Sequence, residues 1–485
     1  MKYRRITVIA LLLLACSPLF AQVAPNCITI EGVRTATEAA YRMDSIYYLP
    51  FDVPAGVTRI TIEREVVVEP EGRAGLTTAI FDPRGTGFLN NGFRGWQEFR
   101  TDPIVITGDR ATTTRKFLPG PIPPGRWHIA QHFTWKSKVA DHVRYKYTII
   151  FSFDGPKPPD AFPEPGYNPG VIKDKPGWYK ADFHAHTTYS DGKGTVEEMV
   201  ASHVAAGFDV VTATDHNVPW AHFDFPAVAE KYPSCLLLAG EEISTVTGHM
   251  NSIGTEPGVW FDPRMVPADG RLPKLMERVR ESGGILSANH PSNTGALGWG
   301  FPTQECERLD AMEVCNGWFN AGDRLSTDMW DGLLKSGRHI TAISGSDCHS
   351  VPKSYGSYSW VWAENLSREA VMEGLRKGHV FISSGSRGPL VYLCVPGTSA
   401  LLGDTVHIGS AQSVQVQARI VGARGMTLRV IWHGGETRIP LDSTFARISC
   451  TVPVDSLLNK SYVRLEVQTA NGTVTALTNP IYIER

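Results

Sequence analysis

Between residues 178 and 384, the chain repeats one pattern: a short apolar run ends in a polar motif that carries histidine or a carboxylate. In chain order the motifs are His184-Ala-His186, Asp215-His216-Asn217, Gly240-Glu241-Glu242, Asn289-His290-Pro291 and Gly345-Ser346-Asp347-Cys348-His349. Helix-like stretches separate several of them: one follows the capping box Thr195-x-x-Glu198, and others are expected near 274–282, 327–335 and 367–376. Strands that alternate with helices favour parallel pairing, in a barrel or an open sheet.

These motifs place their polar side chains at the carboxyl ends of the predicted strands. In a β/α barrel those ends meet on one face, so residues far apart in sequence lie together. His184 and His186 are two residues apart, and such side chains on a strand point to the same side. Asp191 follows in a polar turn and adds an oxygen donor. Histidine and carboxylate donors together suit zinc, manganese or iron better than magnesium or calcium.

Strand-like sequence flanks this region on both sides. Short β-rich runs with turn signals at 82–85 and 120–125 predict an all-β sandwich, and a proline-rich linker follows it. Alternating residues from 414 onward and the hairpin signal Asn471-Gly472 predict a second one. The predicted organisation is a signal peptide at 1–21, an N-terminal β-sandwich at 22–154, a linker at 155–170, a central α/β domain at 171–387 and a C-terminal β-sandwich at 388–485.

The N-terminus has the pattern of an export signal. Lys2, Arg4 and Arg5 precede an apolar run of about 10 residues, which is too short to span a bilayer comfortably. Cleavage after Ala21 predicts an exported protein, periplasmic or secreted. The alternatives are a lipoprotein with its lipid on Cys16 and a retained anchor. No other apolar run has the length of a transmembrane helix.

Charge and cysteine content narrow the function classes. A net charge of −2 over 485 residues gives no reason to expect nucleic-acid binding. Cys16 lies in the predicted signal, so seven of the eight cysteines remain after cleavage. An oxidising compartment permits disulfides, and Cys306 with Cys315 and Cys394 with Cys450 are candidate pairs. Spacing alone does not determine the pairing.

Taken in order, the motifs resemble those of the PHP (polymerase and histidinol phosphatase) domain. The resemblance covers 178–384 and includes His-x-His with Ser-Asp-Gly, Thr-Asp-His, Gly-x-Glu, Gly-His before a short strand, Asn-His-Pro and Gly-Ser-Asp-x-His. It implies a TIM-like, distorted (β/α)7 barrel with a centre of two or three divalent ions, zinc, manganese or iron. The export signal, the flanking β domains and the wording of the motifs resemble most the CehA/McbA branch of metallohydrolases.

The resemblance also implies a set of nine ligands. A first ion would be held by His184, His186, Glu242 and Asp347, a second by Glu242, His249 and His290, and a third by Asp191, His216 and His349. From the same set, the candidate catalytic residues are Asp191, His216, Glu242 and His290. Glu242 is preferred to Glu241 because the motif continues with an apolar residue and a serine, here Ile243-Ser244.

Other polar residues near the motifs are not expected to bind the metal ions. Asp215 is expected to orient a neighbour or to stabilise a turn. Four histidines match no motif position, and the one expected to line the pocket is His222; the others are His203, His339 and His379. Four basic residues lie near the motifs and could contact an anionic substrate, although each is more simply explained as a surface residue: Lys193, Arg264, Arg324 and Lys353.

The sequence therefore predicts an exported metal-dependent hydrolase in which a metal-bridging hydroxide attacks a phosphoester. An amidase, or a carbamate or carboxyl esterase of the CehA/McbA type, is the alternative. A non-catalytic exported protein that binds metal or glycan is the second alternative. The expected partner is a small ester or amide, including anionic ones, and no nucleic acid. The natural substrate, the identity of the metal and the oligomeric state do not follow from the sequence.

Overall fold

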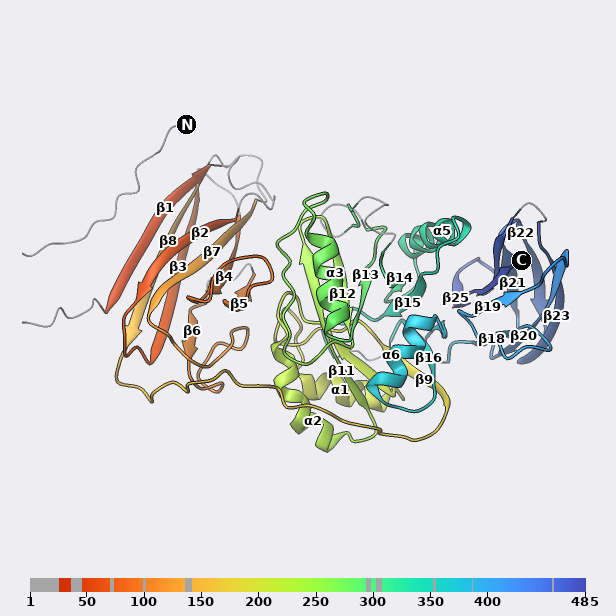
Figure 1. Cartoon of the computed structure of the whole chain (residues 1–485), viewed down its shortest axis with the longest axis horizontal. Coiled ribbons are helices and arrows are strands. Elements are labelled where there is room, and N and C mark those ends of the chain that lie inside the picture. The colour runs from red at the N-terminus through yellow and green to blue at the C-terminus, as the bar shows by residue number, and fades with distance from the viewer. Residues whose placement is uncertain are drawn as a thin grey trace, which may run out of the picture.

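The computed structural model describes residues 26–35, 46–69, 74–98, 102–135, 142–293, 298–301, 308–351, 355–385, 387–455 and 458–485. The described chain forms three parts in a row, with β-sheet at both ends and the helices in the middle (Figure 1). The predicted signal peptide with Cys16, and also Lys353 and Cys306, lie outside the described residues. No helix in the described ranges is long and apolar enough to cross a membrane.

The N-terminal part consists of two four-stranded antiparallel sheets that face each other. The first has the order β1 (Cys27–Thr35), β8 (His142–Ser152), β3 (Arg59–Glu69), β6 (Ile104–Thr107). The second has the order β2 (Tyr47–Val53), β7 (Gly125–Trp135), β4 (Ala74–Phe81), β5 (Phe93–Gln97). Alternate residues of β8 are buried, and Ile60, Trp127 and Ile149 share one core. This is the sandwich that period-2 alternation predicts.

The central part is a mixed sheet with helices packed on it. Its strands, in the order of the chain, are β9 (Gly177–Asp182), β10 (Val210–Ala213), β11 (Leu236–Thr245), β12 (Gly248–Ile253), β13 (Ile285–Ala288), β14 (Ala311–Asn316), β15 (Thr341–Gly345), β16 (Ser357–Ala363) and β17 (Val380–Ser384). Its helices are α1 (Val196–Ala205), η2 (Trp220–Asp224), α2 (Phe225–Lys231), α3 (Arg271–Glu281), α5 (Ala321–Lys335) and α6 (Arg368–Lys377). Strands β10 and β13 are buried along their whole length, as expected where both faces are covered.

The structure confirms the predicted helices but not a (β/α)7 barrel. Helix α1 begins at the capping box of Thr195 and Glu198, and α3, α5 and α6 overlap the three other predicted helices. Strands β9, β10 and β11 are parallel, and so are β13, β14 and β15, but β12 is antiparallel to both neighbours. Only two residues connect β11 to β12, which is enough for a hairpin and too short for the crossover that a parallel pair needs.

Strands β9 and β15 approach each other at their carboxyl ends. Ala185, after β9, forms a parallel bridge with Cys348, after β15. The amide of Asp347 donates to the carbonyl of His184 at 2.8 Å. These contacts bring the first and the last polar motif of the chain side by side.

The C-terminal part continues the central sheet, since β17 pairs with β25 (Val474–Thr478). Beyond β25 the sheet contains β24 (Lys460–Gln468), β21 (Met426–Trp432), β22 (Gly435–Leu441), β26 (Ile481–Glu484) and β19 (Thr405–His407). A second sheet has the order β18 (Leu390–Cys394), β20 (Ser413–Val421), β23 (Phe445–Pro453). Val416, Val430 and Leu465 belong to the core that the two sheets share.

The cysteines of the C-terminal part are not bridged in the structure. Cys394 lies on β18 and Cys450 on β23, and β20 pairs with both strands and separates them. Two strand spacings of nearly 5 Å each exceed the Cα separation of about 7 Å that a disulfide permits. Cys315 is also free.

Candidate metal centre

All nine predicted ligands lie together where the strands of the central sheet end, and the carboxylate of Glu242 is at their centre. Five histidine nitrogens surround it. The Oε1 atom lies 3.3 Å from His184 Nε2, 3.1 Å from His249 Nδ1 and 3.3 Å from His290 Nε2. The Oε2 atom lies 3.3 Å from His186 Nε2 and 2.9 Å from His216 Nδ1. Four separate stretches of the chain thus converge on one carboxylate.

Two further carboxylates complete the cluster. Asp347 Oδ1 lies 3.0 Å from His186 Nε2 and 3.5 Å from His184 Nε2. Asp191 Oδ1 lies 3.3 Å from His349 Nε2 and 3.6 Å from His216 Nε2. We call Asp191, His216 and His349 the outer group, because the side chains of Asp191 and His349 are 54% and 40% exposed. The remaining six residues, which are mostly buried, form the inner group: His184, His186, Glu242, His249, His290 and Asp347.

The donor atoms of the inner group fit a cation better than they fit one another. His184 Nε2, His186 Nε2 and Asp347 Oδ1 are buried without a hydrogen-bond partner, although they lie close together. Buried polar atoms almost always have a partner, and orphaned ones need an explanation such as an ion. One divalent cation between them would satisfy all three atoms at once. The donors are imidazole and carboxylate, which suit zinc, manganese and iron.

The backbone is strained at three positions beside these donors. Asn217, His290 and Asp347 have φ angles of 56°, 28° and 50°. Non-glycine residues seldom adopt positive φ, and such residues cluster where function requires an unfavourable geometry. Three of the five described residues of this kind lie in or next to the cluster, so the surrounding structure fixes the direction of these side chains.

Glu313 belongs to the cluster, although no sequence motif marks it. Its Oε1 accepts from His184 Nδ1 at 3.1 Å, and its Oε2 accepts from the amide of His290 at 2.9 Å and from Asn316 Nδ2 at 3.0 Å. A carboxylate that accepts from Nδ1 leaves Nε2 free to bind a metal and fixes the plane of the ring. The available signal was a lone glutamate inside the buried and mostly apolar strand β14.

Asp215 orients the His-x-His segment, as expected. Its Oδ1 accepts from the amide of Thr187 at 2.9 Å and from Ser190 Oγ at 2.7 Å, and its Oδ2 accepts from Thr187 Oγ1 at 2.7 Å. Asp182 supports the same segment from β9, where it accepts from the amide of His184 at 3.1 Å. His203 Nε2 lies 2.9 Å from the other oxygen of Asp182, which explains a histidine that matches no motif.

Several neighbouring polar residues have structural partners away from the cluster. The prediction that His222 lines the pocket is wrong: its ring is buried, with Nε2 3.0 Å from the carbonyl of Gly240 and Nδ1 accepting from the amide of Gly258. Burial lowers the pKa of His222 to about 4. Arg264 pairs with Asp262, and Arg324 pairs with Glu466. Lys193 is exposed.

Electrostatics couple Glu242 strongly to the histidines. Burial by itself would raise the pKa of the Glu242 carboxyl, but the attraction to His184, His216 and His249 outweighs it and holds the pKa well below its ordinary value. Burial would likewise lower the pKa of His216, but the Glu242 carboxylate beside it raises that pKa to about 10. Without a cation, a proton on His216 therefore balances part of the charge of the buried carboxylate.

Comparison with known proteins agrees with these observations. Residues 182–255 match the family model of the PHP domain, a range that contains His184, His186, Asp191, His216, Glu242 and His249. The search of curated proteins found no significant match.

Three solved structures show weak similarity. A two-domain protein from Bacteroides vulgatus containing a predicted PHP-like metal-dependent phosphoesterase has 15% identity, covers 64% of this chain and 96% of its own, and has a TM-score of 0.35. A proposed metal-dependent phosphoesterase from Bifidobacterium adolescentis has 16% identity, coverage of 40% and 94%, and a TM-score of 0.30. An amidohydrolase from Chromobacterium violaceum, with bound sulfate and no metal, has 17% identity, coverage of 35% and 87%, and a TM-score of 0.27.

These scores are low, so we base the assignment on the family match and on the side chains of the cluster. The match lies on the segment that supplies six of the nine donors. His290, Asp347 and His349 come from beyond it and complete the same cluster in space. With a PHP domain match at residues 182–255 and this set of donors, the protein is a hydrolase enzyme with a site for divalent metal ions.

Proposed function

We propose that the protein is a phosphoesterase that uses two or three divalent ions of zinc, manganese or iron. The observation that carries the proposal is the convergence of five histidine nitrogens on the Glu242 carboxylate, next to three buried donor atoms without hydrogen-bond partners. A bridging carboxylate between histidine-rich sites is the arrangement expected for neighbouring cations.

We assign the ligands to three positions. His184, His186, Glu242 and Asp347 would hold the first ion, Glu242, His249 and His290 the second, and Asp191, His216 and His349 the third. His186 also lies within reach of the outer group, so it is placed between the first and the third position. Bound divalent ions supply an acidified water and stabilise negative charge on the oxygens of the reacting ester.

The side chains around the cluster orient its ligands and leave one side open for the substrate to enter. Glu313 holds the Nε2 atom of His184 toward the cluster, and Asp215 holds the segment that carries His186. The outer group faces solvent, so the substrate would enter over Asp191 and His349. Asp191 and His216 would contact the substrate side of the centre, while Glu242 and His290 would hold its buried side.

A cationic side chain near the outer group favours an anionic substrate. Arg115 Nη1 donates to Thr188 Oγ1 at 2.6 Å, on the segment between His186 and Asp191. Arg115 is exposed, and none of the described carboxylates forms an ion pair with it. A guanidinium without an acidic partner binds phosphate well. This observation favours a small phosphoester over the neutral amide or carbamate of the CehA/McbA alternative.

Export and the CehA/McbA relationship are part of the same proposal. The basic and apolar N-terminal segment supports export, with cleavage after Ala21 or a lipid on Cys16. The flanking β-sandwiches and the wording of the motifs support the branch.

A comparison of substrates tests the reaction class. The metal-replete protein is incubated with p-nitrophenyl phosphate and bis-p-nitrophenyl phosphate, and separately with 1-naphthyl acetate and a naphthyl carbamate. We expect turnover of a phosphate ester and little of the others. Turnover of only the acetate or carbamate would replace the proposal with the esterase or amidase alternative, and no turnover of any ester or amide would favour a binding protein.

Metal binding is expected to release protons. His216, with its pKa raised to about 10 by Glu242, is protonated at neutral pH before binding, and only the neutral ring can coordinate a cation. Affinity for the metal should therefore rise with pH up to the pKa of that ring. Calorimetric titration of the apoprotein in two buffers with different ionisation enthalpies measures the release. Identical heats in both buffers would contradict it.

A further inference from the structure

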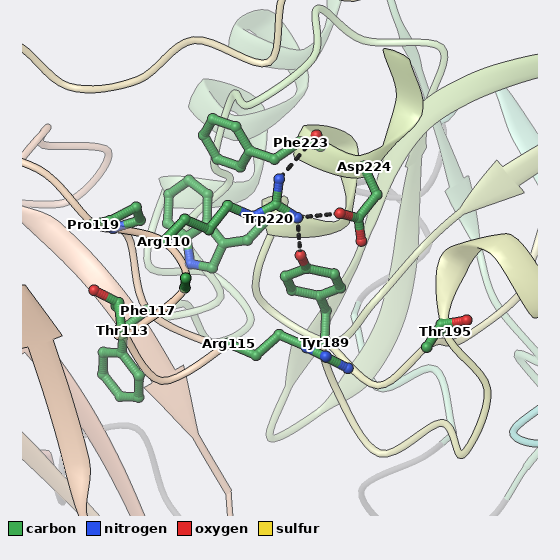
Figure 2. Close-up of a pocket in the computed structure, with 11 residues that line it drawn as sticks. Arg110, Thr113, Arg115, Phe117, Pro119, Tyr189, Thr195, Trp220, Phe223 and Asp224 are labelled. Atoms are coloured by element: carbon green, nitrogen blue, oxygen red, sulfur yellow. Dashed lines mark hydrogen bonds and ion pairs between the residues drawn. The ribbon is translucent and has the colours of Figure 1, made fainter. Parts of the chain in front are cut away.

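Arg110 of the N-terminal sandwich joins two segments of the central part. The residue follows β6, and its guanidinium donates to the hydroxyl of Tyr189, to the carboxylate of Asp224 and, at 2.9 Å, to the carbonyl of Phe223 (Figure 2). Tyr189 is two residues before Asp191, and its ring is buried. Arg110 and the residues it contacts line a pocket of about 440 Å³ between the two parts. Arg115, Thr195 and Trp220 also line it.

Arg115 donates a hydrogen bond to Thr188, the residue next to Tyr189, so two arginines of the sandwich contact the same segment. Its partner Thr188 begins a loop, closed by the hydrogen bond from the Thr188 amide to the carbonyl of Gly194 at 2.9 Å. The loop carries Asp191. The amide of Lys193, on the same loop, donates to the carbonyl of His349 at 2.8 Å. Two ligands of the outer group are therefore connected to the sandwich through this loop.

Glu98 connects the sandwich to the third outer ligand. It follows β5, and its Oε1 accepts from Asn217 Nδ2 at 3.3 Å and from Trp96 Nε1 at 3.0 Å. Asn217 comes directly after His216, and its own Oδ1 accepts from the amide of Ser244 at 2.8 Å. The hydroxyl of Ser244 lies 2.6 Å from His216 Nδ1.

The inner group has a different set of supports. Glu313 and Asp182 orient His184, and Asn289 Nδ2 donates to Glu242 Oε1 at 3.0 Å; all three come from the central part. The sandwich is itself fixed against the central part, because Phe93 of β5 stacks on Trp260 with ring centroids 3.8 Å apart and planes at 6°.

We infer that the N-terminal sandwich is part of the metal centre: Glu98, Arg110 and Arg115 position the outer group, so that the third ion is held at the junction of two parts of the chain. The inference rests on the proposed function, because it assigns that ion to Asp191, His216 and His349. The inner ions depend on the central part and should not respond to these residues. The three are positioning residues, since none of them is offered as a ligand.

Metal titration of the full chain tests this inference. The variant Arg110→Ala/Arg115→Ala is titrated with Mn²⁺ or Zn²⁺ after chelation and dialysis, and bound metal per chain is measured by mass spectrometry. Replacing residues that orient metal ligands costs about 10- to 100-fold in affinity, so the binding step of the third position, which is the step that Asp191→Ala/His349→Ala removes, should weaken by that factor while the other steps stay unchanged. Glu98→Gln should weaken the same step.

Two matched variants distinguish the role of the sandwich residues from the assignment of the third ion to Asp191, His216 and His349. Arg126→Ala, which removes a sandwich arginine paired with Asp52 on the neighbouring strand, should bind all ions as the wild type does. Asp191→Ala/His349→Ala should lose one binding step altogether, that of the third position. If that ligand variant loses the step but the arginine variant and Glu98→Gln keep wild-type affinity, the inference is overturned and the proposed centre stands.

Two other outcomes are decisive. An unchanged titration of the ligand variant would overturn the third position itself. Loss of all metal from the arginine variant would overturn the claim that the inner group is independent of the sandwich; Arg115→Ala alone, a change at an exposed side chain, then shows whether a milder variant has the same effect. Thermal melting of each variant confirms that it is folded.

Discussion

The variant Glu242→Gln is expected to lose hydrolytic activity by more than about 100-fold, which exceeds the cost of losing a residue that merely supports a metal ligand. Glutamine has nearly the same shape but no charge, and one of its two terminal atoms is a donor that cannot bind a cation. Five histidine nitrogens face this side chain, so the change affects every predicted ion that Glu242 touches. Activity and bound metal per chain are both measured, and both should fall.

The adjacent residue provides the control for this variant. Glu241 is also buried, but its Oε2 accepts from the amide of Phe261 at 3.0 Å and it contacts none of the nine ligands through a described hydrogen bond or ion pair. Burial raises the pKa of Glu241 well above its ordinary value, which favours the neutral carboxyl, and glutamine is a close substitute for that form. Glu241→Gln should keep metal and activity. Equal losses in the two variants would show that a buried glutamate, and not the bridging position, is what matters.

The variant Glu313→Gln is expected to lower metal affinity and activity by about 10- to 100-fold. The Glu313 carboxylate accepts three hydrogen bonds, from His184, from the amide of His290 and from Asn316. A glutamine amide group would meet donors on one side, so the ring of His184 would turn or take the other tautomer. Titration of the apoprotein with Mn²⁺ measures the change in affinity, and steady-state kinetics measures the change in activity.

Asp310 supplies the control at the other end of the same strand. It precedes β14, and its Oδ2 accepts from the amide of Leu286 at 3.0 Å, away from the ligands. Asp310→Asn is expected to affect stability without changing metal affinity. If it weakens metal binding as much as Glu313→Gln does, then Glu313 acts through the stability of the strand and not through His184.

The parts of the centre that were predictable are those in which one motif follows a strand directly. His184, His186, His216, Glu242 and Asp347 each end an apolar run, and period-2 alternation and the ordered motifs were enough to place them together. Glu242 was separable from Glu241 because the motif continues with an apolar residue and a serine, here Ile243-Ser244. The structure places them as expected, Glu242 among histidines and Glu241 against Phe261.

What the sequence did not show depends on contacts between distant segments. Glu313 lies 129 positions from His184, and a lone carboxylate in a buried strand has no local motif. The antiparallel direction of β12 follows from the short connection between β11 and β12, and the order of the motifs gives no information about the length of that connection. The role of Glu98, Arg110 and Arg115 depends on how the sandwich docks against the central part, which single-sequence patterns do not encode.

The most direct test of the central claim is hydrolysis of bis-p-nitrophenyl phosphate by the same protein sample before chelation, after chelation, and after addition of Mn²⁺, Zn²⁺ or Fe²⁺. The variant His184→Ala/His186→Ala is assayed in parallel. The proposed centre predicts that chelation removes the activity, that at least one of the metals restores it, and that the variant stays inactive under all conditions. Full activity in the metal-free variant would contradict a metal-dependent hydrolase at this site.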